Sequence, residues 1–370
     1  MNEEQQPRTD DLDVTPPAGV GLMKMIRRIH LRAALLALVA LAVVGSGAAY
    51  AATRTTTRPI GTGVVVINTK LAYQGASAAG TGIVLTSSGE ILTNNHVIAG
   101  ATTIRVVVPN TKHTYTARVV GYDTTADVAV LQLQNASNLK AVSIGDASKL
   151  TLGARVKTVG NAGGTGTLTS TTGTVTGLNK AITVQSDTGA AEQLNGLIET
   201  NATLQPGDSG GPLLNSAGRV VGMDTAASRS SSFAASASTD GYAIPIEKAL
   251  AISLQIVSGK ASATVHVGAT AFLGVQVADI SSSPFRNGSA PTAAAGATIV
   301  AVVPSSPASK AGLLPGDVIT ALDGQAVTSA SALERIVLAA KPGAKVTITY
   351  TDSSGQSQNA AVTLGSGPPQ

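Results

Sequence analysis

"TLQPGDSGGPLL", residues 203–214, surrounds Ser209 with two prolines and three glycines. Pro-Gly and Gly-Gly pairs are typical of tight turns, so one interpretation is a simple connection between two strands. The other interpretation is that Ser209 is a nucleophile and that the glycines present bare N–H groups to a developing negative charge. The rest of the chain must decide between the two.

The composition indicates a mostly β protein with an aliphatic core. The 370 residues include 40 Gly and 16 Pro but only six Tyr, three Phe and no Trp. Such a chain is long enough for two ordinary domains and suits short strands joined by turns. The net charge of +4 is small and forms no basic stripe, so we expect no nucleic-acid partner.

Cysteine and histidine usage restricts the chemistry. The chain contains no cysteine, which excludes disulfides, thiol nucleophiles and thiolate metal sites. The four histidines are far apart in sequence and form no HxH or HxxxH pair; they are His30, His96, His113 and His266. We therefore expect neither a metal nor a cofactor.

The hydrophobic pattern predicts two folded regions. From residue 64 to about 244, short runs of Val, Ile, Leu and Thr recur between turn residues, which is typical of a β-barrel or sandwich. A helix is predicted to start at Pro245 and to stop at Gly259. A second block, residues 270–365, has its own strands, a hairpin turn at Asp323-Gly324 and a helix with a capping box from Ser331 to Glu334.

Gly207-Asp208-Ser209-Gly210-Gly211 also fits the G-x-S-x-G elbow of α/β-hydrolases. That fold requires the order Ser, acid, His, for which the chain offers Asp240 and His266. It also requires a helix after the serine, but "GPLLNSAGRVVGMD" has prolines, glycines and β-branched residues there. The context therefore argues against this alternative.

The opposite order, His, Asp, Ser, has strong candidates. His96 lies in "ILTNNHVIAG" at the end of an apolar strand, and Asp127 lies in "TTADVAVLQL" before another. A carboxylate beside apolar strand residues is costly unless it is hydrogen-bonded, and a histidine N–H can be its partner. Each residue alone has an ordinary structural explanation, but the three together favour a catalytic triad.

At this point the chain resembles the HtrA (Deg) serine proteases. The resemblance rests on "TNNHVI", "TADVAVL", "GDSGGPLL", "GYAIPI", "FLGV" and "PASKAGLLPGDVITALDGQAV", and it covers roughly residues 62–365. It implies a chymotrypsin-like double six-stranded β-barrel followed by one PDZ domain, a small β-barrel with helices. The predicted limits are 62–259 for the trypsin-like protease domain and 268–365 for the PDZ domain.

The resemblance also implies roles for individual residues. Ser209 would be the nucleophile, His96 the general base and then acid, and Asp127 the group that fixes the imidazole tautomer. The N–H groups of Gly207 and Ser209 would form the oxyanion hole. Residues 161–164 match a loop that takes part in activation in relatives.

Asp208 departs from the family pattern, which commonly has Asn before the nucleophile. Digestive trypsin-like enzymes pair this acid with a new N-terminus, whereas here the chain continues upstream. Either Asp208 is buried beside another cation, for which Arg155 is a candidate, or its charge is exposed in an inactive arrangement of the loop. For the specificity pocket, Thr203 is expected at the floor and Asp224 within reach of the mouth. Because no acid is expected at the floor, the pocket is predicted to accept medium aliphatic side chains of the substrate.

In the second domain, Phe272-Leu273-Gly274-Val275 resembles the carboxylate-binding loop of PDZ domains. Backbone N–H groups there would hold a peptide C-terminus, which adds as a strand beside a helix. Leu333, Ile336 and Val337 of that helix would flank the peptide, or they are core residues, or both.

The first 60 residues predict export. An uncharged stretch of 21 residues follows the basic "KMIRRIHLR", which indicates a cytoplasmic leader (1–30), a membrane-spanning segment (31–52) and a tether (53–61). The alternative is a signal peptide cleaved near Ala51, after the A-x-A pattern of residues 49–51. Either way the protease and PDZ domains are expected outside the cytoplasm, attached to the bilayer or secreted.

The functional expectation is an ATP-independent serine endopeptidase that cleaves misfolded or C-terminally tagged extracytoplasmic proteins, in quality control and stress response. The alternative is an envelope chaperone or scaffold with latent catalysis. Relatives form trimers, often with N-terminal aromatics. Tyr73 is the one aromatic in the corresponding region here, and a homotrimer is predicted.

Overall fold

The computed structural model describes residues 61–185, 191–225, 240–280 and 295–370. The predicted leader, membrane segment and most of the tether lie outside the described residues. No helix within the described part of the chain has both the length and the apolar character needed to cross a membrane.

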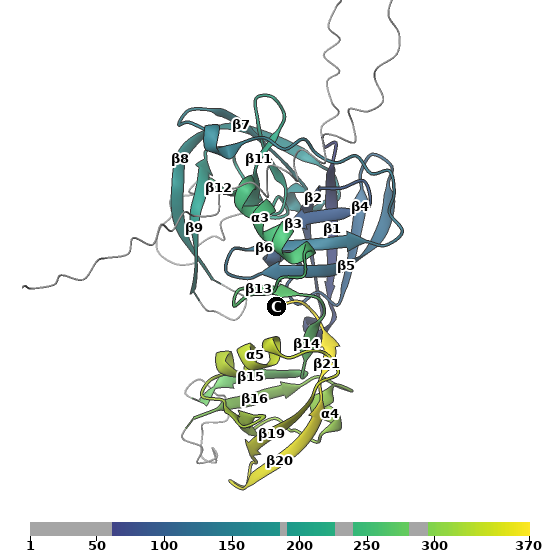
Figure 1. Cartoon of the computed structure of the whole chain (residues 1–370), viewed down its shortest axis with the longest axis vertical. Coiled ribbons are helices and arrows are strands. Elements are labelled where there is room, and N and C mark those ends of the chain that lie inside the picture. The colour runs from purple at the N-terminus through teal and green to yellow at the C-terminus, as the bar shows by residue number, and fades with distance from the viewer. Residues whose placement is uncertain (1–60, 186–190, 226–239, 281–294) are drawn as a thin grey trace, which may run out of the picture. The chain divides into compact units, whose positions relative to one another are not determined.

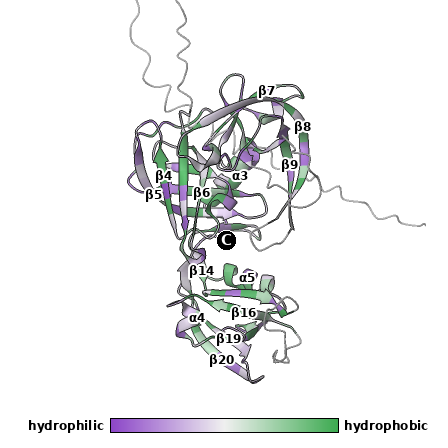
Figure 2. Cartoon of the chain, turned by 180° about the vertical axis from the view of Figure 1, so that it is seen from behind, coloured by the Kyte–Doolittle hydropathy of each residue, from purple (hydrophilic) through white to green (hydrophobic). Residues whose placement is uncertain are grey.

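Six strands form the first barrel. Short runs of β-branched residues separated by turns produce them, and the pairing of β5 with β6 closes the sheet order β5-β4-β1-β2-β3-β6. Burial alternates along the second half of β1, from Ile67 to Leu71, and Figure 2 shows green and purple bands alternating along β4 and β5. The strands are β1 (Val64–Leu71), β2 (Ala76–Val84), β3 (Glu90–Thr93), β4 (Thr103–Val108), β5 (His113–Asp123) and β6 (Val128–Leu133).

The second barrel is closed in the order β10-β11-β12-β9-β8-β7. Its core is as aliphatic as the composition predicts, and it includes Ile198, Leu213 and Val221. The strands are β7 (Arg155–Gly160), β8 (Thr169–Gln185), β9 (Ala191–Thr200), β10 (Pro212–Asn215), β11 (Val220–Thr225) and β12 (Gly241–Pro245). The predicted double six-stranded β-barrel is therefore confirmed.

Helix α3 (Ile246–Val257) joins the barrels and begins where Pro245 predicted it. It packs against β5 and β6 of the first barrel and β11 and β12 of the second (Figure 1). The chain then returns to the first barrel, because β13 (Val265–Val267) pairs with β5. Ile256, Val265 and Val130 form a small buried cluster at this junction. The predicted domain limit at residue 259 stays a prediction.

The remaining strands build the PDZ domain around a core that includes Ile299, Ile319 and Leu333. Its main sheet has the order β15-β16-β17-β19-β20, so β15 is an edge strand. The elements are β14 (Thr270–Phe272), β15 (Val275–Asp279), β16 (Ala297–Val302), α4 (Pro307–Lys310), β17 (Val318–Leu322), β18 (Gln325–Ala326), α5 (Ala330–Ala339), β19 (Lys345–Thr351), β20 (Ser357–Thr363) and β21 (Gly365–Gly367).

Two local predictions in the PDZ domain have different outcomes. Asp323 and Gly324 both have positive φ and connect β17 to β18, which confirms the hairpin turn. The capping box at Ser331 is wrong, because the helix starts one residue earlier. Ser329 is extended and its side chain accepts the N–H of Ala332, so Ser329 is the N-cap and Ser331 lies inside α5.

The junction cluster predicts a clear stability difference between two neighbouring residues of α3. Ile256 is 1% exposed, whereas Val257 is 49% exposed. Ile256→Ala should destabilise the protein by about 2–4 kcal/mol because it leaves a cavity. Val257→Ala should change stability by less than about 0.5 kcal/mol. Thermal midpoints from far-UV circular dichroism test this, and equal midpoints for the two variants would contradict it.

Candidate active site

His96 lies on a one-turn helix directly after β3. This helix, α2 (Asn95–Ile98), directs the His96 side chain to the surface, where 48% of it is exposed. Its Nδ1 lies 2.9 Å from Oδ2 and 3.1 Å from Oδ1 of Asp127, and its backbone N–H donates to the same carboxyl group at 3.0 Å. The imidazole is therefore oriented by Asp127.

Asp127 is buried just before β6 and has a positive φ of 54°. An aspartate tolerates this backbone region better than most residues, and here it turns the carboxyl group toward His96. The Thr225 hydroxyl donates to Asp127 Oδ2 at 3.0 Å, and the Asn94 side-chain amide donates to the Asp127 carbonyl at 2.9 Å. Asp127 thus connects α2 of the first barrel to the end of β11 in the second.

Ser209 is buried in the turn before β10 and is attached to the first barrel through its backbone. The Thr81 N–H donates to the Ser209 carbonyl at 2.8 Å, and the Thr93 hydroxyl donates to the Thr81 carbonyl at 2.7 Å. Thr93 is three residues before His96, so these bonds bring the serine turn to α2. The turn precedes a β-hairpin, β10 and β11, which excludes the helix of an α/β-hydrolase elbow.

Gly207 has φ of 98°, a conformation that side chains rarely adopt. A Cβ atom here would lie 2.2 Å from the Asn161 carbonyl oxygen. The Gly207 carbonyl accepts the Thr81 hydroxyl at 2.7 Å, which fixes the orientation of the adjoining peptide. Among the described residues, no hydrogen bond uses the Gly207 N–H, so this donor is available to a ligand.

Asp208, immediately before Ser209, bonds to its own loop. Its Oδ2 accepts the Gln205 N–H at 2.9 Å, while Oδ1 is buried and has no hydrogen-bond partner among the residues that the structure describes. Burial raises the pKa of Asp208. Arg155 is exposed at the start of β7, and within the described residues no ion pair involves Asp208. The predicted Arg155 partner is therefore wrong, because the loop folds the carboxyl group inward.

Asp224 is completely buried on β11, and neither of its carboxyl oxygens has a hydrogen-bond partner in the described structure. Burial raises the pKa of Asp224 well above its usual range, and the nearby charge of Asp208 raises it further. Thr203, the other residue predicted for the specificity pocket, is exposed. Both residues stay candidates for that pocket.

The loop at residues 161–164 supports the serine turn. The Asn161 N–H donates to the Thr81 hydroxyl at 2.9 Å, and the Gly163 N–H donates to the Pro206 carbonyl at 2.7 Å. The loop therefore contacts both the first barrel and the segment that carries Gly207. Thr81 is the shared partner of these segments, and the sequence analysis did not single it out.

A distant segment contacts both ends of α2. The Gly100 N–H donates to the Pro369 carbonyl at 2.7 Å, and the Asn95 side-chain amide donates to the Gln370 carbonyl at 2.9 Å. Pro368 and Pro369 are buried. The helix that carries His96 is therefore held by residues that follow β21. No sequence motif indicated this contact.

The predicted PDZ residues lie around the edge strand β15. The Leu273 carbonyl accepts the Ala308 N–H and the Gly274 carbonyl accepts the Val303 N–H, both at 2.9 Å. These bonds fix the carbonyls of the loop before β15. Phe272 also stacks on Tyr73 at 5.2 Å, so the aromatic residue predicted for a trimer contact is half-exposed but already has a ring partner.

The helix residues predicted to flank a peptide belong to the PDZ core. Leu333 is 2% exposed, Val337 is 9% exposed, and Ile336 is partly buried against the same cluster. Leu333 and Val337 are therefore core residues, which is one of the two roles that the sequence left open for them. No cluster of three or more metal-ligating side chains occurs in the described ranges of the chain.

Comparisons with known proteins follow the same division of the chain. Residues 80–223 match the trypsin-like peptidase domain, and residues 271–364 match the PDZ domain. Serine protease PepD of Mycobacterium tuberculosis is 37% identical over 316 residues, which cover 82% of this chain and 63% of PepD. The chain belongs to the HtrA family of serine proteases.

Other HtrA relatives are similar over the same region. Serine protease Do-like HtrB of Bacillus subtilis is 35% identical and covers 70% of this chain and 55% of its own length. A probable periplasmic DegP-like serine endoprotease of Pseudomonas putida is 34% identical, with 79% and 57% covered. Among solved structures, the HtrA-type protease AlgW with a tripeptide is 28% identical, with 84% and 96% covered and a TM-score of 0.46.

These alignments span only part of the relatives. The chain covers 63% of the length of PepD and 55% of HtrB. Family membership therefore rests on the protease and PDZ regions that these alignments cover.

The buried carboxyl groups predict a pH-dependent stability. The pKa of Asp224 is higher in the folded protein than its ordinary value of 3.8. Its contribution to the free energy of unfolding is therefore fully present below about pH 3.8 and is lost as pH rises through the folded-state pKa. Asp224→Asn removes this ionisation, so the thermal midpoint of the variant relative to that of the unmodified protein should increase as pH rises above about 4. Circular dichroism melts of the full chain at several pH values measure the difference.

Asp352→Asn is the matched control. Side-chain and backbone hydrogen bonds lower the pKa of this exposed residue to about 2, so it stays ionised throughout that range. Its effect on the midpoint should not grow between pH 4 and pH 8. A constant difference for Asp224→Asn would show that the buried carboxyl group does not titrate as expected.

Proposed function

We propose that the protein is an ATP-independent serine endopeptidase that cleaves misfolded or C-terminally tagged extracytoplasmic proteins. The observation that carries the proposal is the hydrogen-bonded group of Asp127, His96 and Thr225 beside the anchored turn of Ser209. Membership of a serine protease family supports the same reaction. Hydrolysis through an acyl-enzyme needs water but no nucleotide or metal.

His96 and Ser209 would perform the covalent step together. Asp127 accepts a hydrogen bond from the N–H at Nδ1 of His96, so the neutral ring presents Nε2 as a base. His96 then takes the proton of the Ser209 hydroxyl, whose oxygen attacks the substrate carbonyl. The protonated ring gives that proton to the leaving amine, and water later repeats the sequence to release the acyl group.

The oxyanion would be held by the N–H groups of Gly207 and Ser209. The positive φ of Gly207 and the bond from Thr81 to its carbonyl hold the backbone next to this N–H before substrate arrives. Donors that are already oriented need no rearrangement when charge develops, and one such donor is commonly worth about a hundredfold or more in turnover. The primary pocket would be formed near Thr203 and Asp224.

The PDZ domain would bind peptide C-termini. β15 is an edge strand with α5 beside it, so an extended peptide can add to its free edge. The loop Phe272-Leu273-Gly274-Val275 would hold the terminal carboxylate. Gly274 has φ of 86°, and a Cβ there would meet the Ser306 side chain, so the loop requires glycine.

The location proposed for these domains is extracytoplasmic. The apolar stretch at residues 31–52 would attach them to the bilayer, or cleavage near Ala51 would release them. Relatives described as probable periplasmic endoproteases support this side of the membrane. A homotrimer is the proposed assembly.

Ser209→Ala tests the reaction directly. The full chain should degrade casein, and the variant should lose essentially all of this activity, since removing a triad member commonly costs about 10⁴-fold or more. Survival of casein degradation in the variant would refute the nucleophile assignment. An unmodified protein that degrades nothing but suppresses aggregation would instead favour the chaperone.

Thr225 offers a second test, because it acts only through Asp127. Thr225→Val removes the hydroxyl that donates to Asp127 Oδ2 and should lower kcat by about 10-fold with little change in KM. Thr225→Ser restores the donor and should recover most of the activity. The pH profile of kcat should shift in Thr225→Val but not in Thr225→Ser; equal profiles would mean that the hydroxyl is only structural.

A further inference from the structure

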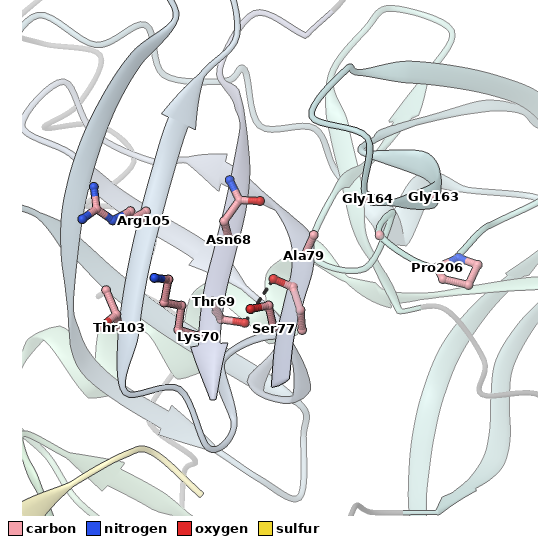
Figure 3. Close-up of a pocket in the computed structure, with 12 residues that line it drawn as sticks. Asn68, Thr69, Lys70, Ser77, Ala79, Thr103, Arg105, Gly163, Gly164 and Pro206 are labelled. Carbon is pink, nitrogen blue, oxygen red and sulfur yellow. Dashed lines mark hydrogen bonds between the residues drawn. The ribbon is translucent and has the colours of Figure 1, made fainter. Parts of the chain in front are cut away.

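An open groove of about 560 Å³ is lined on one side by Gly207 and its neighbours and on the other by strands of the first barrel. One wall is the outer face of β1, β2 and β4, and the other is formed by Gly163, Gly164 and Pro206 (Figure 3). Because Gly207 is a proposed oxyanion donor, a substrate carbonyl bound there would lie beside this groove. The groove is therefore placed to receive residues next to the scissile bond.

Two cations stand on the barrel wall. Asn68 of β1 pairs with Arg105 of β4, and Lys70 pairs with Thr103, so Lys70 and Arg105 are diagonal neighbours on the same exposed face. Figure 3 shows both side chains across the groove from the glycine loop. Among the described residues, neither cation has a carboxylate within ion-pair distance. The wall therefore presents unneutralised positive charge.

The opposite wall is open because it lacks side chains. Gly163 and Gly164 both have positive φ. A Cβ on Gly164 would lie 3.3 Å from the Cβ of Ala79 on β2 and would narrow the groove at this point. Because neither glycine carries a side chain, the loop can lie this close to Ala79 without filling the groove beyond it.

The lining residues indicate which side of the scissile bond the groove serves. The proposed acyl-side pocket involves Thr203 and Asp224 of the second barrel. Neither of these described residues lines the groove, which leads from Gly207 toward the first barrel instead. The groove is therefore assigned to the leaving-group side.

We propose, on the basis of the proposed endopeptidase function, that Lys70 and Arg105 make this groove selective for Asp and Glu on the leaving-group side of the scissile bond. A strand advances about 3.3 Å per residue, so an extended substrate brings residues two to four positions after the bond along the wall. Two exposed ion pairs should raise kcat/KM about 3- to 10-fold over an uncharged substrate.

Internally quenched peptides test the preference with the full chain. One set keeps the acyl side constant and places Asp/Glu or Asn/Gln two to four residues after the scissile bond; a second set places the same residues before it. We expect the acidic advantage only in the first set. About 0.5 M NaCl should largely remove it, because exposed pairs are screened.

Variants of the two cations identify the cause. Lys70→Ala with Arg105→Ala should abolish the acidic advantage while cleavage of the Asn/Gln peptide is retained. Lys70→Glu with Arg105→Glu should reverse the preference toward Lys/Arg peptides. Arg219→Ala is the matched control, since this exposed cation lies in the β10–β11 turn outside the groove, and it should keep the advantage. Equal thermal midpoints exclude misfolding.

Binding separates this inference from the proposed function. Ser209→Ala protein, measured by fluorescence anisotropy, should bind the acidic peptide about 3- to 10-fold more tightly than the amide peptide, and the two cation substitutions should remove the difference. Equal binding and equal cleavage of the two peptides, or an acidic advantage on the acyl side, would overturn the groove assignment. Selective binding without any cleavage by the unmodified protein would support the groove and refute the endopeptidase.

Discussion

The site depends on the hydrogen bonds that Asp127 must form once it is buried. A carboxyl group removed from water is strongly destabilising unless donors replace its hydration. Here the donors come from both barrels: the backbone and ring of His96 from the first, and the hydroxyl of Thr225 from the second. The hydrogen bonds that satisfy the carboxyl group also connect the two barrels and orient the imidazole.

The serine turn obeys a different constraint, which is the close approach of backbone to backbone. Gly207 lies against the Asn161 carbonyl, and Gly210 lies so close to the Thr81 carbonyl that a Cβ would overlap it. These glycines allow Thr81 to bond to the turn on both sides of Asp208. The resulting loop is rigid where charge would develop, yet it buries the titratable Asp208 beside the serine.

Strand periodicity predicted a mostly β protein, and the order of the motifs around His96, Asp127 and Ser209 predicted their grouping. The double barrel and the PDZ domain were implied by the resemblance of those motifs to the HtrA family. The sequence did not predict the partners that the fold supplies from afar. The hydroxyl of Thr225 and the carbonyl of Pro369 contact the site from distant positions, and no local pattern marks them. The prediction of Arg155 as the partner of Asp208 was wrong, because opposite charges in a sequence do not show which way a loop turns its side chains. Ser331 failed as a cap because Ser329, two residues earlier, competes for the same role.

The return of the chain to the first barrel has a consequence for the order of folding. β13 covers the edge of β5, and Val265 and Ile256 complete a cluster with Val130. During synthesis or export, the first barrel keeps an unpaired strand edge until residue 267 has emerged, after the whole second barrel. Such an edge is open to wrong pairing.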